Sequence, residues 1–155
     1  TGRTHHRTPN IITSLELDPA EMEKRNIHLQ KKYAEIEENE VRFEELHCED
    51  SEYLIVAFGS CARIAQKAME MAREEGIKVG LLRPITLWPF PSKAIAARAA
   101  QVKGILTVEL NAGQMVEDVR LAVKCKVPVE HFGRLGGIVP DPDEVITALK
   151  EKLIK

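Results

Sequence analysis

Apolar residues recur along the chain at two alternating spacings, which predict strands and helices in turn. Residues 53–58 form a continuous apolar run, as expected of a parallel strand that is covered on both faces. Over 60–76, small apolar residues return at the spacing of one helical face, and a glycine ends the predicted helix. A second strand over 78–82 and a second helix over about 92–100 repeat this pattern.

The next strand and helix form the clearest βα unit. Residues 105–110 predict a buried strand, and from residue 114 onward the apolar positions fall on one helical face. Between them, 109–113 form a polar turn at the carboxyl end of the strand. A fourth strand is predicted over 128–132, and Asp141-Pro142 begins a final helix. Alternating strands and helices of this kind predict an α/β fold, a three-layer sandwich with a mostly parallel sheet.

The residues before this pattern have a different character. Residues 1–17 show little periodicity and are predicted to be a linker. Residues 18–52 are predicted to hold an amphipathic helix, begun by Asp18-Pro19, and an acidic connector. The stretch 44–52 is expected to be solvated, because runs of charge are usually exposed. The α/β domain is therefore assigned to 53–155.

The predicted N-terminal helix carries a narrow apolar seam with polar interruptions. Its positions recur at alternating steps of four and three residues, namely Met22, Asn26, Leu29, Tyr33, Ile36, Glu40 and Phe43. Such a seam packs either on the helix's own domain or on a neighbouring subunit, and the sequence favours neither.

Composition narrows the classes of function. The 155 residues carry a formal net charge of −2, which argues against a nucleic-acid-binding domain. No apolar run approaches the ~20 residues that span a bilayer, so no membrane contact is expected. Three widely spaced cysteines form no CxxC pair and fit a reducing, cytoplasmic setting. His5-His6 lacks a third ligand, so no metal site is predicted. Thr1 at the start suggests a chain cut from a longer polypeptide, and N-terminal processing would leave the same start.

The junction where the predicted strand 53–58 leads into a helix offers two candidate sites, Gly59-Ser60 and Cys61. Gly59-Ser60 offers free N–H groups to an anion, but the sequence around it lacks both GxGxxG and GK[ST]. We therefore expect a turn, with Ser60 as the helix cap. Cys61 in the first helical turn is either a thiol of lowered pKa or a small buried residue. The second reading is favoured because no base accompanies it.

Polar residues also gather at the predicted strand ends. Arg83 is able to hold a carboxylate or phosphate, although a salt bridge that joins subunits or anchors a loop is the favoured role. Glu109 could act as a base, yet no His, Ser or Cys stands beside it in sequence. Hydrogen bonds between the loop backbone and the side chains of Glu109 and Asn111 are therefore expected. The glycines of the loop 133–137 permit close backbone approach or a positive φ, and loop flexibility explains them equally well.

Four ordered motifs resemble one enzyme family. They are YLIVAFGSCAR at 53–63, RPITLWPFP at 83–91, VELNAGQMVEDV at 108–119 and FGRLGG at 132–137. Together they resemble the C-terminal domain of 2-oxoacid:ferredoxin oxidoreductases. The Trp-Pro-Phe-Pro form at 88–91 is most similar to the 2-ketoisovalerate (3-methyl-2-oxobutanoate) type.

The resemblance implies a transketolase C-terminal-like fold in a thiamine-diphosphate enzyme. Enzymes of this family decarboxylate a 2-oxoacid, pass electrons through iron–sulfur clusters to ferredoxin and transfer the acyl group to coenzyme A. The resemblance implies that thiamine diphosphate with Mg and the clusters are held elsewhere in the whole enzyme, with no cofactor in this chain. The resemblance also implies that the partners of this chain are the other subunits or domains of the oxidoreductase.

No catalytic residue is carried over from the family to this chain. The residues that match family motifs are assigned to interdomain or subunit contacts, namely Arg83, Glu109, Asn111, Gly113, Gln114, Arg134 and Gly137. The first hypothesis is thus a non-catalytic structural and subunit-contact domain. The alternative is a free-standing nucleotide- or anion-binding α/β domain that uses the loops at the strand ends.

Overall fold

The computed structural model describes residue 8 and residues 15–154 of the chain. Two compact units divide the sequence, residues 1–35 and residues 36–155. The histidine pair His5-His6, Thr1 and most of the predicted linker 1–17 lie outside the described residues. None of the helices in the described part is long and apolar enough to cross a membrane.

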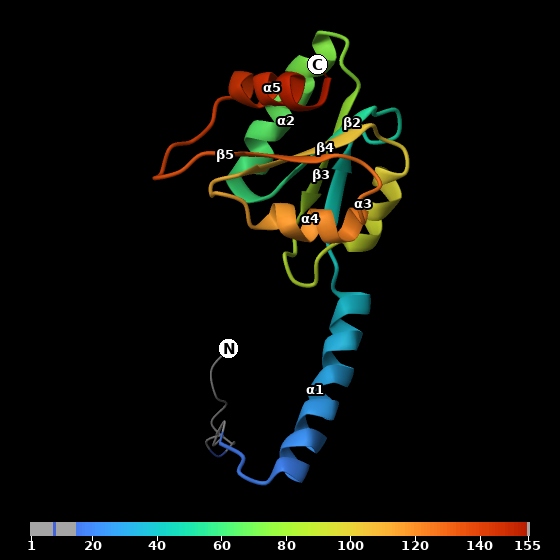
Figure 1. Ribbon diagram of the computed structural model, residues 1–155, viewed down its shortest axis with the longest axis vertical. Helices are drawn as coiled ribbons and strands as arrows, with labels where there is room; N and C mark the ends of the chain where they lie inside the picture. Colours follow the sequence, from blue (N-terminus) through green and yellow to red (C-terminus); the bar gives the residue numbers. More distant parts are fainter. Residues whose placement is uncertain (1–7, 9–14, 155) are drawn as a thin grey trace. The chain divides into compact units, whose positions relative to one another are not determined.

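Helices and strands alternate along the described chain (Figure 1). In order they are α1 (Pro19–Asn39), β1 (Phe43–Leu46), β2 (Tyr53–Ala57), α2 (Gly59–Glu74), β3 (Val79–Pro84), α3 (Ser92–Ala99), β4 (Gly104–Glu109), α4 (Met115–Val123), β5 (Val129–Gly133), α5 (Pro142–Leu149) and a π-helical turn (Lys150–Ile154).

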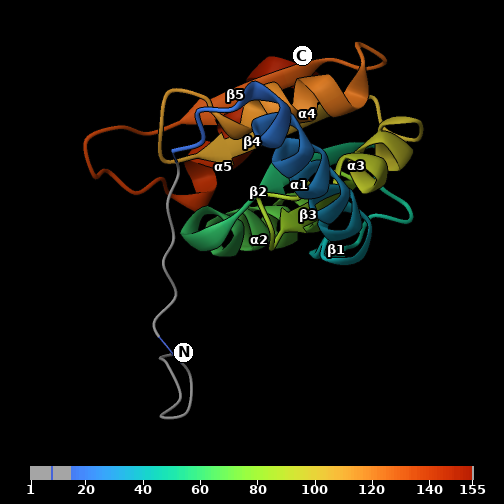
Figure 2. The same cartoon turned by 90° about the horizontal axis from the view of Figure 1, so that it is seen from below.

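The strands form one sheet in the order β1-β3-β2-β4-β5. β2 runs parallel to both β3 and β4, and β4 runs parallel to β5. Helices α2 and α5 lie on one face of the sheet and α3 and α4 on the other (Figures 1 and 2). The three-layer α/β sandwich with a mostly parallel sheet, predicted from the alternation of periods, is confirmed.

Side chains of the central strands alternate between two core layers. Leu54 and Val56 of β2 pack in the cluster that contains residues of α3 and α4. Ile55 and Ala57 point the other way and pack with residues of α2 and α5. Because both faces of β2 are covered, its sequence is apolar at every position, as a buried parallel strand requires.

The acidic stretch 44–52 does not have the structure that its sequence predicts. Instead of a solvated connector, it supplies β1, which pairs antiparallel with β3 at the edge of the sheet. Cys48 and Ser51 follow and are buried. Four of its five acidic side chains have a basic partner far along the chain, which offsets their charge: Glu44–Arg83, Glu45–Arg98, Asp50–Arg73 and Glu52–Lys103.

Helix ends follow the capping signals in the sequence, with one exception. Asp18 Oδ1 accepts a hydrogen bond from the Ala20 N–H at 2.8 Å. Asp141 and Glu144 form a capping box at α5. The exception is Ser60, which was expected to cap α2: the helix begins one residue earlier, at Gly59, and no side chain caps it.

The first helix is shorter than its sequence pattern suggests. It ends at Asn39, so Phe43, assigned to the apolar seam, lies instead in β1. No residue of α1 is buried in the described structure. A helix of this length gains most of its stability from packing, so its seam is expected to pack either on this domain or on a neighbouring subunit.

A core substitution tests this architecture. Leu106 of β4 is completely buried, and Leu106→Ala is expected to lower the free energy of unfolding by about 2–5 kcal/mol, since it leaves a cavity. Leu121→Ala is the matched control, because the Leu121 side chain on α4 is 74% exposed and its loss should change stability by less than about 0.5 kcal/mol. Urea denaturation measures both, and equal effects would contradict the assigned layers.

Candidate functional site

The polar turn between β4 and α4 is organised around the carboxylate of Glu109. This side chain is 1% exposed. Its Oε2 accepts hydrogen bonds from the backbone N–H groups of Gln114 (3.2 Å) and Met115 (2.8 Å), and Oε1 accepts one from Val116 (3.1 Å). These N–H groups lie at the start of α4 and have no acceptor within the helix. The carboxylate also faces the positive end of the helix dipole. The expectation that Glu109 bonds to loop backbone is confirmed.

Asn111 gives the turn its shape. Its Oδ1 accepts a hydrogen bond from the Gly113 N–H at 2.7 Å, which closes a turn built on an Asn side chain. Gly113 has a φ of +110°, a conformation that residues with a Cβ rarely adopt. The expected backbone role of Asn111 is therefore also confirmed.

His131 of β5 completes the site and was not identified from the sequence. Its Nε2 donates to the Asn111 carbonyl at 3.3 Å, and its Nδ1 lies 3.4 Å from Glu109 Oε1. Nδ1 also lies 3.3 Å from Thr107 Oγ1, because Thr107 and His131 are partners in the parallel pairing of β4 and β5. His131 could have been identified only from the register between β4 and β5, which places it opposite Thr107. The pattern of apolar residues in one strand does not contain this information.

Gly133 allows the turn to approach β5 closely. A Cβ built at Gly133 would lie 2.2 Å from the Asn111 carbonyl oxygen and 2.6 Å from His131 Nε2. No larger residue fits without moving the backbone of the turn. The end of β5 and the turn after β4 are thus one packed corner, which we call the β4–β5 corner: residues 107–116 and 131–133.

The remaining residues that the sequence analysis assigned to contacts are spread over several elements. Arg83 is at the carboxyl end of β3 and pairs with Glu44 of β1 at 2.8 Å, so its salt bridge joins two strands within the chain. Arg134 is in contact with the corner through its N–H, which donates to the Glu109 carbonyl at 3.2 Å, and its side chain pairs with Glu144 at 3.2 Å. Gln114 is exposed at the start of α4. Gly137 is exposed in the β5–α5 loop, with a φ of +85°.

The two thiols in the core are not activated. Burial raises the pKa of Cys48 to about 11. Burial, and secondarily the charge of Glu109, raises the pKa of Cys61. The reading of Cys61 as a small buried residue is therefore supported over that of a thiol of lowered pKa. In the described part of the chain, no three His, Cys, Asp or Glu side chains gather into a group able to hold a metal ion.

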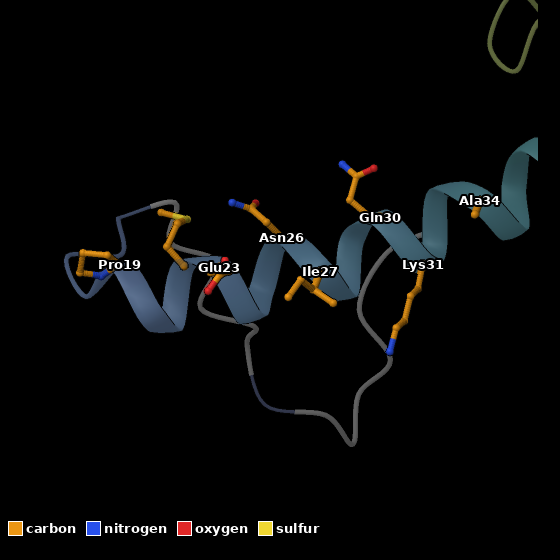
Figure 3. Close-up of a pocket in the computed structure, with 8 residues that line it drawn as sticks. Pro19, Glu23, Asn26, Ile27, Gln30, Lys31 and Ala34 are labelled. Atoms are coloured by element: carbon orange, nitrogen blue, oxygen red, sulfur yellow. The ribbon is translucent and has the colours of Figure 1, made fainter.

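One face of α1 forms a shallow groove of about 680 Å³ (Figure 3). The eight residues that line it all come from this helix: Pro19, Met22, Glu23, Asn26, Ile27, Gln30, Lys31 and Ala34. Apolar and polar side chains are interleaved along it, and none of them is buried. This groove is a helix surface and not an enclosed ligand cavity.

The fold and the corner together define a transketolase C-terminal-like α/β domain. The solved structure "Split gene transketolase, inactive beta4 tetramer" shares this fold, with a TM-score of 0.62 and 20% identity over 73% of this chain and 41% of that chain. The family described as "Pyruvate:ferredoxin oxidoreductase core domain II" matches residues 51–145. The chain therefore belongs to the core domain II family of the pyruvate:ferredoxin oxidoreductases.

Comparisons with individual proteins narrow the type of oxidoreductase that the chain resembles. It is 48% identical to "Ketoisovalerate oxidoreductase subunit VorB" of Methanothermobacter thermautotrophicus and 46% identical to that of Methanothermobacter marburgensis. Each comparison covers 92% of this chain but 40% of the relative, so the chain spans well under half of their length. The 2-oxoglutarate:ferredoxin oxidoreductase from Magnetococcus marinus, solved with 2-oxoglutarate, coenzyme A and succinyl-CoA bound, matches with a TM-score of 0.75 and 25% identity, over 88% of this chain and 24% of that one. The resemblance to the 2-ketoisovalerate type is confirmed.

The role of Glu109 can be measured directly. Glu109→Gln preserves shape but removes the charge that three N–H groups contact, so we expect the free energy of unfolding to fall by about 1.5–3 kcal/mol. Glu117→Gln makes the same chemical change on the exposed side of α4 and should cost under about 1 kcal/mol. Thermal and urea denaturation compare the two variants. Similar losses in both would contradict the assigned role.

Proposed function

We propose that this chain is a structural and subunit-contact domain of a thiamine-diphosphate-dependent 2-oxoacid:ferredoxin oxidoreductase of the 2-ketoisovalerate type. The whole enzyme would convert its oxoacid to acyl-CoA and CO2 and reduce ferredoxin. The observation that carries the proposal is the use of Glu109: the acidic side chain best placed for chemistry is fully occupied by backbone N–H groups.

The described residues offer no ligand set for the metal-containing cofactors of such an enzyme. No group of three potential ligands is present for a metal ion in this part of the chain, and two of the three cysteines are buried with no disulfide partner. We therefore infer that thiamine diphosphate with Mg and the iron–sulfur clusters are held by other domains or subunits. Free cysteines also fit the cytoplasmic location that we propose.

The family-matched residues fall into two groups in this proposal. Arg83, Glu109, Asn111 and Gly113 act inside the domain: Arg83 joins β3 to β1, and the other three shape the turn that follows β4. Gln114, Arg134 and Gly137 lie at or near the surface of that edge and are offered as the contacts to neighbouring subunits or domains.

The alternative, a free-standing anion-binding domain, is less well supported. A helix N-terminus at a strand end is the usual anion site of such folds, and the N-terminus of α4 is filled by a carboxylate of the chain itself. At α2, Gly59 and Ser60 remain exposed, but the nearby negative charge of Glu109 that acts on Cys61 opposes an anion there.

A chimera tests the proposal. The matched segment of the Methanothermobacter marburgensis VorB subunit is replaced by this chain, and the complex is purified with its partner subunits. We expect assembly and 2-ketoisovalerate-dependent ferredoxin reduction within about tenfold of the parent, because a contact domain with an intact fold preserves the catalytic geometry. The chain alone, given thiamine diphosphate, Mg and 2-ketoisovalerate, should release no CO2. Decarboxylation by the isolated chain, or a chimera that assembles without activity, would contradict the proposal.

A further inference from the structure

The loop that follows β3 presents apolar side chains on a fixed backbone. The N–H groups of Ile85 and Thr86 both donate to the Arg42 carbonyl, at 2.9 and 3.1 Å, and Thr86 Oγ1 donates to the Pro89 carbonyl at 2.8 Å. These bonds tie the loop to the residue just before β1, and the two segments lie side by side in Figure 1. The loop is thus held in place by the sheet edge.

This fixed backbone leaves large apolar groups in contact with water. Phe43, Ile85, Leu87 and Trp88 are 38%, 48%, 47% and 56% exposed. Beside them lies a groove of about 710 Å³, whose apolar lining includes Val41, Phe43, Trp88 and Phe90. Clustered exposed apolar residues on a rigid surface are typical of a binding site for another protein segment. We call this surface the Trp88 groove.

The charges at the rim of the Trp88 groove indicate what it binds. Glu37 and Glu38 line it, are exposed and have no ion-pair partner among the described residues. They lie in the last turn of α1, which contains no basic residue, where the helix dipole disfavours negative charge. Lys93 is the basic residue among those that line the groove. The rim therefore carries excess negative charge, which a basic partner would relieve.

We propose that the Trp88 groove receives a protein segment whose apolar side chains are flanked by lysine or arginine, supplied by another part of the oxidoreductase. The apolar side chains fill the groove between Phe43, Trp88 and Phe90, and the basic side chains pair with Glu37 and Glu38. This inference rests on the proposed contact function and names the surface and the chemistry of the contact.

Trp88 is the single tryptophan of the chain, so its fluorescence reports the groove directly. The probe is a short amphipathic peptide of leucine and lysine, and its control has glutamate in place of every lysine. We expect the lysine peptide to shift Trp88 emission to shorter wavelength in a saturable way, since it excludes water from the indole. The glutamate peptide should leave the emission unchanged.

Charge variants test whether the acidic rim of the Trp88 groove contributes to peptide binding. Glu37→Gln with Glu38→Gln should weaken binding of the lysine peptide about five- to tenfold, as expected for two exposed charge pairs. Glu74→Gln with Glu151→Gln removes the same charge from exposed positions outside the groove and should change the affinity by less than about twofold. All four positions are exposed, and circular dichroism verifies that both variants are folded.

Four outcomes would overturn the inference, three of them in the peptide experiments. These three are the absence of a spectral shift with the lysine peptide, an equal shift with the glutamate peptide, and equal weakening in the two double variants. A shift that depends on protein concentration without peptide would assign the groove to a second copy of this chain and would also overturn it. An active chimera without peptide binding refutes this inference alone, whereas peptide binding with an inactive chimera refutes the proposed function alone.

Discussion

The domain depends on one buried carboxylate. A charge removed from water is costly unless it is fully hydrogen-bonded, and Glu109 meets this condition through three N–H groups at the start of α4. The same bonds fix where β4 ends, how the turn bends and where α4 begins. Through Asn111 and His131 the turn then reaches β5. Strand, helix and neighbouring strand are therefore held at one corner by one side chain.

This arrangement has a consequence for function. In open α/β sheets the carboxyl ends of the strands are the usual place for a ligand. Here that edge is closed at β4, because the carboxylate occupies the N–H groups that would otherwise bind an anion. The loops at this edge are consequently shaped by contacts within the chain, as suits a domain that presents surfaces to its neighbours. The Trp88 groove, beside the loop that follows β3 at the same carboxyl edge, extends this principle, because a hydrogen-bonded loop there presents a fixed apolar surface.

Much of this fold is predictable from the sequence because its signals are local. The four parallel strands are short apolar runs, the helices between them have a clear period, and Asp141 and Gly76 mark helix ends by their own chemistry. The role of Glu109 was predictable for the same reason, since an acidic residue between a strand and a helix start can reach the free N–H groups.

What the sequence did not predict depends on distant residues. β1 reads as solvated because Glu44 and Glu45 are charged, and only the fold brings Arg83 and Arg98 to them. His131 likewise has no local signal, because its contact with the turn depends on the register between β4 and β5. The sequence-based predictions thus failed at β1, which depends on ion pairs, and at His131, which depends on strand register. Neither feature is visible in the spacing of apolar residues.

Amide hydrogen exchange at the start of α4 tests the central claim most directly. The first N–H groups of a helix normally exchange readily, because they have no acceptor within the helix. If Glu109 binds them, the Met115 and Val116 amides should be protected, whereas the Ser60 amide at the uncapped start of α2 should exchange quickly. Exchange at Met115 and Val116 as fast as at Ser60 would contradict the account.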